Sequence, residues 1–294
     1  MCTGTSVCIN RVELVFTYVN PDVIFPSITP SGPTSFCQGG SVNLNAGTGY
    51  SAYHWSTGAT SQTITASSTG TYTVSVTSTT GCTTGSASIS VNSYPNPAVS
   101  ISKTNITCAG SNNGTATANP SGGTPGYSYS WSNGQSTQTA TNLAAITYYV
   151  TVYDSHSCST TGSITITAPS ALSASISSQT NVSCYGGATG SATVTASGGT
   201  PGYTYIWAPS GGSGSTATNL SAGTYTVTVR DANNCSSVQT ATITQPTALT
   251  GTASATNTSC NGGSNGTATA SPSGGTPGYT YYWFPSGQTS NPAT

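Results

Sequence analysis

The sequence has almost no charged residues. Of its 294 residues, 2% are charged, and the formal net charge is −1, whereas charged residues make up about a quarter of an average globular domain. Three basic residues are too few to neutralise a run of phosphates, which argues against nucleic acid as a partner. The chain also lacks a polybasic segment for anionic lipid, and its four acidic residues cannot build an acidic calcium array.

Long apolar runs are also missing. No run is long enough to cross a bilayer, so we expect no membrane insertion. Met1 is followed by Cys2 and Thr3, not by the basic stretch and apolar core of a signal peptide. We therefore expect the sequence to be a mature chain or a fragment.

The remaining composition indicates folded domains. Hydrophobic residues make up 34% of the chain, and Tyr alone occurs 17 times, which is more than a disordered chain usually carries. We expect compact cores covered by neutral surfaces of Ser, Thr, Asn and Gly.

Internal repetition is the strongest signal in the sequence. The segment Ser-Gly-Gly-Thr-Pro-Gly-Tyr (the SGGTPGY segment) begins at Ser121, Ser197 and Ser273, with an offset of 76 residues each time. All four tryptophans occupy one repeat position, and we expect each indole to lie in the core of its unit. These residues are Trp55, Trp131, Trp207 and Trp283.

The cysteines follow the same period. Cys108, Cys184 and Cys260 are 76 residues apart, and a second series contains Cys82, Cys158 and Cys235. The second series gains one residue in the Gly/Ser stretch after Trp207, where a surface loop tolerates an insertion. The first unit keeps Cys37, Trp55 and Cys82 but lacks the SGGTPGY segment, so we interpret it as a different subtype of the same architecture.

Alternating side chains predict strands. Tyr and Val alternate with Thr at 224–229, and similar patterns occur at 72–76 and 148–152, which is the period of a half-buried strand. Clusters of Gly, Pro, Ser and Asn interrupt these runs about every 8–12 residues, as in β-sandwiches. The predicted fold is all-β, with tandem immunoglobulin-like β-sandwich domains in a linear array and the Trp of each domain on a middle strand.

Nine cysteines without a Cys-x-x-Cys motif predict disulfides rather than a metal site, and therefore an oxidising compartment. Pairing within units joins Cys37 to Cys82, Cys108 to Cys158 and Cys184 to Cys235, and would pin loops at one end of each sandwich. Each bond would close a loop of about 50 residues and contribute about 4 kcal/mol in the chain-entropy model. The alternative pairing joins neighbouring units through Cys82–Cys108, Cys158–Cys184 and Cys235–Cys260.

The two ends of the sequence allow two interpretations. The fourth unit stops at Thr294, before its second Cys, and residues 12–19 read as a strand without an obvious partner. We interpret the sequence as a truncated chain. The alternative is a head-to-tail filament, in which the N-terminal strand of one copy completes the last sandwich of the next and Cys8 reaches Cys260. The disulfide partners of Cys2, Cys8 and Cys260 stay open.

The last three units resemble the SprB-type repeat of Bacteroidetes gliding-motility adhesins. The resemblance rests on segments such as Cys184-Tyr-Gly-Gly-Ala-Thr-Gly, the SGGTPGY segment, Asn219-Leu-Ser-Ala-Gly-Thr-Tyr and Asp231-Ala-Asn-Asn-Cys. The first unit looks like the PKD/immunoglobulin-like modules of such proteins, through Phe36-Cys-Gln-Gly-Gly-Ser and His54-Trp-Ser-Thr-Gly. One departure is Ile146, which stands where other units carry Gly70 and Gly223 and would be strained if that turn needed a positive φ.

The resemblance implies export to the cell surface, typically by the type IX system, and a role in adhesion, gliding or a surface fibre. The expected organisation is an N-terminal strand segment, a PKD/immunoglobulin-like sandwich, two full repeats and an incomplete third repeat. Their bounds are 1–27, 28–95, 96–170, 171–246 and 247–294. The expected partners are neighbouring repeats or copies of the chain itself.

Catalytic chemistry is not expected. His54 precedes the core Trp55 and should face outward on its strand, so no triad is predicted. Asp154 and Asp231 each stand four residues before a second-series Cys, and we interpret them as turn residues whose carboxylates accept backbone N–H bonds. His156 lies in the same loop as Asp154. No cofactor or metal site is predicted, and the SGGTPGY segment has no Lys or following helix to hold phosphate.

Two features of the sequence relate to sugars. The tyrosines of the SGGTPGY segments and two residues beyond, such as Tyr203 and Tyr205, are predicted to pack in the core or across strands; a carbohydrate-binding face is the alternative. Seven Asn-x-Ser/Thr sequons could carry glycans, and the dense Ser and Thr make O-linked sugar equally plausible. The sequons lie at Asn105, Asn113, Asn181, Asn219, Asn234, Asn257 and Asn265.

Overall fold

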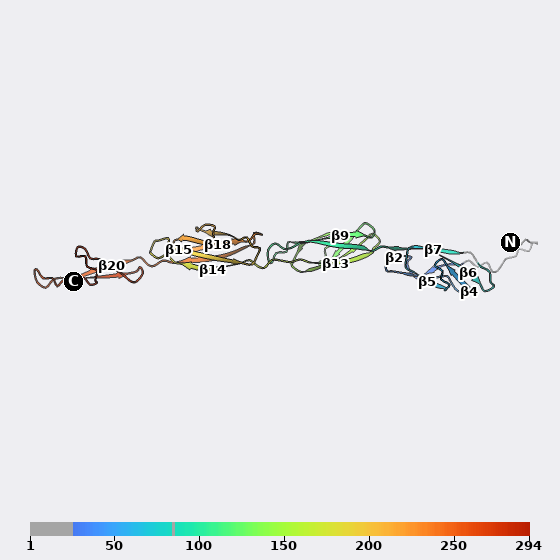
Figure 1. The fold of residues 1–294 in the computed structure, drawn as a ribbon, viewed down its shortest axis with the longest axis horizontal. Coiled ribbons are helices and arrows are strands. Elements are labelled where there is room, and N and C mark those ends of the chain that lie inside the picture. The colour runs from blue at the N-terminus through green and yellow to red at the C-terminus, as the bar shows by residue number, and fades with distance from the viewer. Residues whose placement is uncertain (1–25, 84–85) are drawn as a thin grey trace, which may run out of the picture. The chain divides into compact units, whose positions relative to one another are not determined.

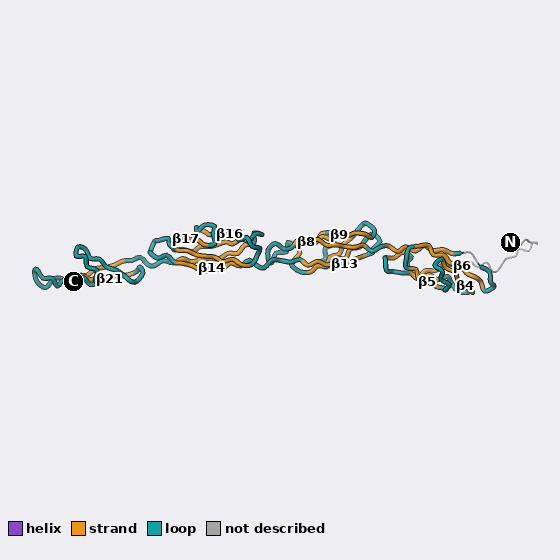
Figure 2. The backbone as a smooth tube through the Cα atoms, in the orientation of Figure 1, coloured by secondary structure: helices purple, strands orange, loops and turns teal. Residues whose placement is uncertain are grey.

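The computed structural model describes residues 26–83 and 86–294. Every regular element in this part of the chain is a β-strand (Figures 1 and 2), so the all-β prediction is confirmed. The predicted N-terminal strand at 12–19, together with Cys2 and Cys8, lies outside the described residues. In the described part, no helix is long and apolar enough to cross a bilayer.

The described chain divides into two compact bodies, whose bounds differ from those of the repeat units. One contains residues 26–83, 86–102, 117–140 and 148–164; the other contains Lys103–Ala116, Thr141–Thr147 and Thr165–Thr294.

The first seven strands form an immunoglobulin-like sandwich of two sheets. One sheet has the order β1-β3-β5, and the other has the order β2-β7-β6-β4, with a parallel β2–β7 pair. Leu44, Val74 and Val76 are among the most deeply buried side chains of its core. The strands are β1 (Thr29–Pro30), β2 (Ser35–Cys37), β3 (Val42–Asn45), β4 (Tyr50–Trp55), β5 (Thr63–Ala66), β6 (Gly70–Ser78) and β7 (Ala87–Tyr94).

Two sets of six strands then repeat one topology. In each set, the first, second and fourth strands form one sheet, and the third, fifth and sixth strands form the other. The first set contains β8 (Pro97–Thr104), β9 (Gly114–Gly122), β10 (Ser128–Trp131), β11 (Thr139–Leu143), β12 (Thr147–Tyr153) and β13 (Ser159–Thr165). The second set contains β14 (Ser173–Thr180), β15 (Gly190–Ser197), β16 (Thr204–Ala208), β17 (Thr216–Leu220), β18 (Gly223–Arg230) and β19 (Ser236–Ile243).

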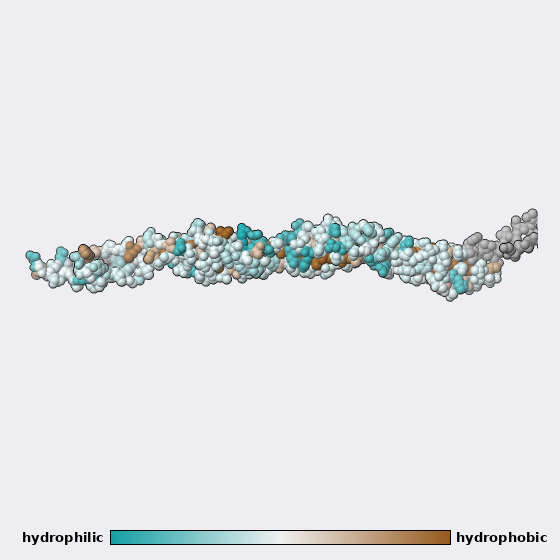
Figure 3. Space-filling model, turned by 45° about the horizontal axis from the view of Figure 1, so that its top comes forward, coloured by the Kyte–Doolittle hydropathy of each residue, from teal (hydrophilic) through white to brown (hydrophobic). Residues whose placement is uncertain are grey.

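The alternation read from the sequence produces these cores. Along β18, Tyr225, Val227 and Val229 are buried while the intervening Thr side chains stay half-buried, because successive side chains point to opposite faces of a strand. Ser, Thr and Gly are left outside, and the molecular surface accordingly shows pale and hydrophilic colours with only small apolar patches (Figure 3).

The tryptophan prediction holds for three of the four units. Trp55, Trp131 and Trp207 are 3–4% exposed, and each indole N–H donates to the backbone carbonyl of Ser61, Thr137 or Gly214. Trp283 keeps the equivalent bond to the Ser290 carbonyl but is only half-buried. The prediction of a core position for Trp283 is therefore wrong for this structure. Its neighbouring strands β20 (Thr250–Thr256) and β21 (Thr267–Ser273) form a two-stranded sheet, which offers no second layer to cover an indole.

Ile146 is not strained. Neither Gly70 nor Gly223, its counterparts in other units, has a positive φ, so the turn makes no demand that a branched residue would violate. The Ile146 side chain is 57% exposed, so the turn accommodates it at the surface.

Gly190, at the start of β15, is tightly enclosed. A Cβ at this position would lie 2.6 Å from Ile243 Cγ2 and 2.7 Å from the Leu220 carbonyl oxygen. Gly190→Ala is expected to destabilise this sandwich by about 1–3 kcal/mol, as overpacking does. The free energy of opening of the β18 amides, measured by hydrogen exchange, checks the prediction. Gly223→Ala is the control because its Cβ would meet nothing closer than 3.8 Å; equal losses in both variants would contradict the prediction.

Candidate functional site

The two disulfides of the described chain join successive units. Cys37 pairs with Cys158 and Cys108 pairs with Cys235, with Cα–Cα distances of 5.4 and 5.6 Å. The within-unit pairing predicted from the sequence is therefore wrong, and so is its alternative. The first Cys of one unit bonds to the second Cys of the following unit.

The sheet topology explains why the within-unit prediction fails. In the unit of β14–β19, the Val182 amide bonds to the Thr244 carbonyl, next to the end of β19, so the Cys184 loop lies at that end. Cys235 lies immediately before the opposite end of the same strand. Eight residues of β19 separate the two ends by about 26 Å, whereas a disulfide needs Cα atoms within about 7 Å.

Both bridged second cysteines, Cys158 and Cys235, sit in hairpin turns built around a buried carboxylate. Asp231 accepts backbone N–H bonds from Asn233 and Cys235 at 2.9 Å each, and its second oxygen accepts the Thr200 amide at 2.9 Å. This holds the turn against the SGGTPGY segment. The interpretation of this aspartate as a turn residue is confirmed, and the contact with Thr200 was not foreseen.

The turn around Asp154 has the same geometry. Its carboxylate accepts the amides of His156, Cys158 and Thr124 at 2.8–2.9 Å. Burial opposes ionisation of Asp154, but these amide bonds outweigh it and lower its pKa. At the other turn, the Thr200 amide is the main cause that lowers the pKa of Asp231, against the effect of burial.

The lowered pKa of Asp231 predicts an acid-sensitive turn. Because the folded-state pKa lies below the unfolded value of about 3.9, the carboxylate stabilises the fold at higher pH and loses this effect as pH falls through the folded-state pKa. Asp231→Asn is expected to lower stability at neutral pH and to remove this acid dependence from β18 and β19. Hydrogen exchange between about pH 3 and 6 tests this. Unchanged acid dependence would contradict the assignment, and Asp154 provides an internal reference in the same chain.

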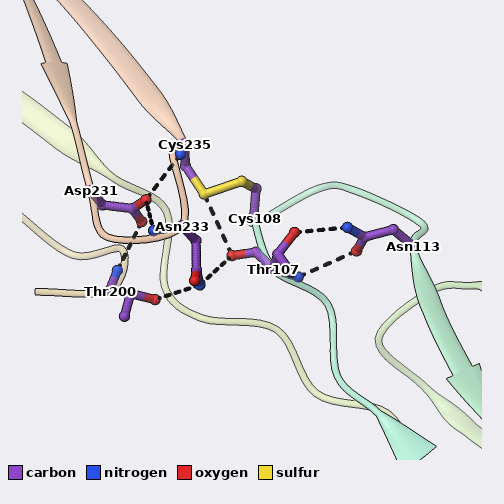
Figure 4. Close-up of a disulfide and its surroundings, with 7 residues drawn as sticks. All are labelled: Thr107, Cys108, Asn113, Thr200, Asp231, Asn233 and Cys235. Atoms are coloured by element: carbon purple, nitrogen blue, oxygen red, sulfur yellow. Dashed lines mark hydrogen bonds between the residues drawn. A yellow bond between two sulfur atoms is a disulfide. The ribbon is translucent and has the colours of Figure 1, made fainter.

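The Cys108–Cys235 bond lies within a polar network (Figure 4). Asn233 Nδ2 donates to the Thr107 carbonyl oxygen at 3.1 Å and to Thr200 Oγ1 at 2.9 Å. Thr107 is in turn held by Asn113, which accepts its amide and donates to its hydroxyl. Sequence reasoning missed Asn233 and Thr107. The recurrence of Asn at 113 and 265, six residues after Thr107 and Ser259, was a usable signal.

The Cys37–Cys158 bond has different neighbours. The rings of Tyr94 and His156 stack with centroids 3.7 Å apart, and Asn96 Nδ2 donates to the Gln38 carbonyl. His156 therefore serves packing beside the bridge. Both bridges combine a covalent bond with non-covalent contacts between successive units.

Three described cysteines, Cys82, Cys184 and Cys260, are exposed free thiols. The predicted disulfides of Cys82 and Cys184 are thus wrong in this structure. Cys82 nevertheless sits in a turn like those of the bridged hairpins, since the Ser78 amide bonds to the Cys82 carbonyl and Ser78 Oγ accepts the Cys82 amide. Ser78 takes the place of the aspartate.

The remaining residues that the sequence suggested for a functional site do not come together in one site. His54 is exposed on β4, as predicted, and the described residues contain no group of three His, Cys, Asp or Glu placed to hold a metal ion. Tyr203 and Tyr205 pack against the core of their sandwich, in line with the packing prediction, and a carbohydrate-binding face stays the alternative. All seven sequon asparagines are exposed, so their glycosylation also stays a prediction.

Three segments of the chain match one family model. The model described as "SprB repeat" matches residues 100–136, 176–212 and 252–288. The chain thus contains three segments similar to the SprB repeat. Each match contains a first-series Cys, an SGGTPGY segment and a Trp, so the repeat resemblance read from the sequence is confirmed. No curated protein sequence matches the chain.

Several solved structures align with the chain at low identity. The N-terminal eight Ig domains of Down Syndrome Cell Adhesion Molecule align at 12% identity over 75% of this chain and 36% of that one, with a TM-score of 0.43. A C-terminal intimin fragment aligns at 13% identity over 54% and 69%, with a TM-score of 0.36. Three N-terminal domains of the bacteriophage RB49 capsid protein Hoc align at 16% identity over 74% and 95%, with a TM-score of 0.31. The chain thus spans about a third of the first of these structures.

Proposed function

We propose that this chain is the structural and adhesive repeat region of a secreted bacterial cell-surface protein, an adhesin stalk or part of an extracellular fibre. The observation that carries the proposal is the disulfide between one unit and the next, present twice. Such bonds need an oxidising compartment and cross-link the first three of the four units. A repeat array that must remain folded outside the cell gains directly from both properties.

The scarcity of charged residues fits the same function. A surface of Ser, Thr, Asn and Gly resists non-specific electrostatic association, and the two perturbed carboxylates, Asp154 and Asp231, are fully used by backbone amides. We infer that the protein is not an enzyme. The resemblance to gliding-motility adhesins further suggests export by a Bacteroidetes cell, and intact-mass measurement would reveal any N- or O-linked glycans.

The proposal is tested on the producing cell. Antibody raised against the chain should label intact, unpermeabilised cells, and deletion of the coding region should reduce attachment or gliding on a surface. A cytoplasmic location of the labelled protein would contradict the proposal. A normally attached deletion strain would contradict its adhesive part.

A second candidate is a head-to-tail filament completed by strand donation. It is favoured by the two-stranded β20–β21 sheet, beside which a cavity of about 600 Å³ is lined by residues including Leu249, Ala253 and Tyr281. An added strand from another copy would cover apolar surface there. Electron microscopy of the purified chain should then show filaments, and deletion of residues 1–27 should shorten them. An unchanged length distribution would contradict donation by that segment.

A further inference from the structure

A second cavity, of about 510 Å³, lies beside the free thiol of Cys184. Its lining includes Ser183, Cys184, Gly275 and Thr276. These residues come from two successive SprB repeats, as do the residues that hold the bridged hairpin of Asp231 one repeat earlier. Each half of the cavity can therefore be compared with its bridged counterpart.

The Cys184 half matches the loop of the bridged Cys108. The Gly187 amide bonds to the Cys184 carbonyl at 3.0 Å, as the Ser111 amide bonds to the Cys108 carbonyl. The Ser183 amide donates to Thr189 Oγ1 at 3.1 Å, just as the Thr107 amide donates to Asn113 Oδ1. The Cys184 loop thus has the same fold as the bridged loop, although its thiol is free.

The Thr276 half matches the loop that receives the Asp231 carboxylate. Gly275 has a φ of +63°, against +62° for Gly199, and the hydroxyl of Tyr279 donates to the Gly274 carbonyl as that of Tyr203 donates to Gly198. A Cβ at Gly199 would lie 2.6 Å from Asp231 Oδ2, so the glycine makes room for a carboxylate. The amide of Thr276 follows Gly275 in the same way, but the Leu249 side chain lies beside Gly275, with its Cβ and Cδ1 3.3 and 3.4 Å from the position of an added Cβ. An incoming carboxylate therefore has to displace this exposed side chain.

Exposed apolar side chains border the cavity. Tyr185 and Leu249 are each 62% exposed and both line it. Two exposed apolar side chains that border one polar cavity mark a surface suited to cover by a partner.

We propose that this cavity is the docking site of a β-hairpin whose turn carries Asp and, four residues later, Cys: a hairpin equivalent to β18–β19, whose Asp231 lies against Thr200 of its own repeat. Its carboxylate accepts the Thr276 amide, and its Cys forms a disulfide with Cys184. Other segments of the chain fit less well. The Cys82 turn has Ser78 in place of the aspartate, and the residue four before Cys8 is Gly4.

The bond forms by thiol–disulfide exchange. One thiolate attacks an oxidised small-molecule disulfide such as glutathione disulfide, and a mixed disulfide forms with release of one reduced thiol. The second thiolate then displaces the second reduced thiol. Two protein thiols are oxidised by two electrons, one disulfide is reduced to two thiols, and the protons of the protein thiols pass to the released glutathione.

A synthetic peptide with the sequence of Thr224–Ile243, which contains the β18–β19 hairpin, provides the first test. It is added to the chain in a glutathione redox buffer, and disulfides are mapped by mass spectrometry without reduction. The peptide is expected to bond predominantly to Cys184. An even distribution over Cys82, Cys184 and Cys260 would overturn the proposal, because it would mark exposure alone as the cause.

If the free peptide does not fold, a tethered form tests the same disulfide. A second copy of Asn219–Gln245 is appended after Thr294, where it continues the alignment with the preceding repeat. Its Cys is expected to pair with Cys184. Pairing with Cys260 instead, or no pairing, would overturn the proposal.

A matched variant tests the contribution of the carboxylate. The change Asp231→Ala, made only in the appended copy, is expected to reduce the fraction of Cys184 in the disulfide and to leave the Cys108–Cys235 bond intact. An unchanged fraction would contradict the role of the Thr276 amide. These measurements do not involve attachment to a surface. The proposed docking site and the proposed adhesive function can therefore be refuted separately.

Discussion

Replacing Trp207 by alanine is expected to destabilise its sandwich by about 3–5 kcal/mol, the usual cost of removing a buried aromatic side chain. Trp207 is 4% exposed, packs within the core of β14–β19 and satisfies its indole N–H at the Gly214 carbonyl. The substitution therefore removes apolar contacts and leaves the Gly214 carbonyl without its donor. A loss of this size is comparable to much of the stability of a small domain.

The matched control is Trp283→Ala. Trp283 occupies the same repeat position and donates to an equivalent carbonyl, but it is half-buried, so a clearly smaller loss is expected. Because tandem domains do not unfold as one unit, the opening free energies are best read by hydrogen exchange within β18 and β21 separately. Equal losses for the two variants would contradict the burial argument.

Removal of the Cys108–Cys235 bond is expected to have the second large effect. The bond spans 127 residues, and closure of a loop of that size constrains the unfolded chain by about 4–5 kcal/mol in the chain-entropy model. The double variant Cys108→Ser with Cys235→Ser avoids a stray thiol. It is expected to melt at a lower temperature and to become sensitive to protease near Thr107 and Asn233, whose contact the bond reinforces.

Cys82→Ser is the control for this variant, because Cys82 is a free thiol in the structure. Its melting temperature should match that of the unmodified chain. The fall in melting temperature caused by a reducing agent should also be the same in both proteins. If Cys82→Ser destabilised the protein as much as the double variant, the pairing described here would be contradicted.

Much of the fold follows from the sequence by local rules. The alternation at 224–229 predicts a strand with Tyr225 and Val227 inside, and the structure has that arrangement. The shared position of the tryptophans predicts their burial wherever two sheets are present. Trp283 departs from this rule because its burial needs a second sheet. The position of a Trp within the repeat does not show whether that sheet is present.

The disulfide pairing was beyond the reach of spacing arguments. Both cysteines of a unit lie in loops, but whether two loops share an end depends on how many strands run between them and in which direction. In the unit of Cys184 and Cys235, the final strand β19 separates the two loops. The role of Asp231 was readable as local turn chemistry, whereas its bond to Thr200 joins residues 31 positions apart and needs the folded hairpin.

The two disulfides also have a topological consequence. The covalent loop from Cys37 to Cys158 overlaps the loop from Cys108 to Cys235, so every peptide bond between Cys37 and Cys235 lies inside at least one closed ring. A single proteolytic cut anywhere in that stretch leaves the two halves joined. Under tension, the enclosed backbone cannot extend to its full contour length until sulfur–sulfur bonds break. The rings therefore make this part of the chain tolerant of both nicking and pulling for as long as its surroundings stay oxidising.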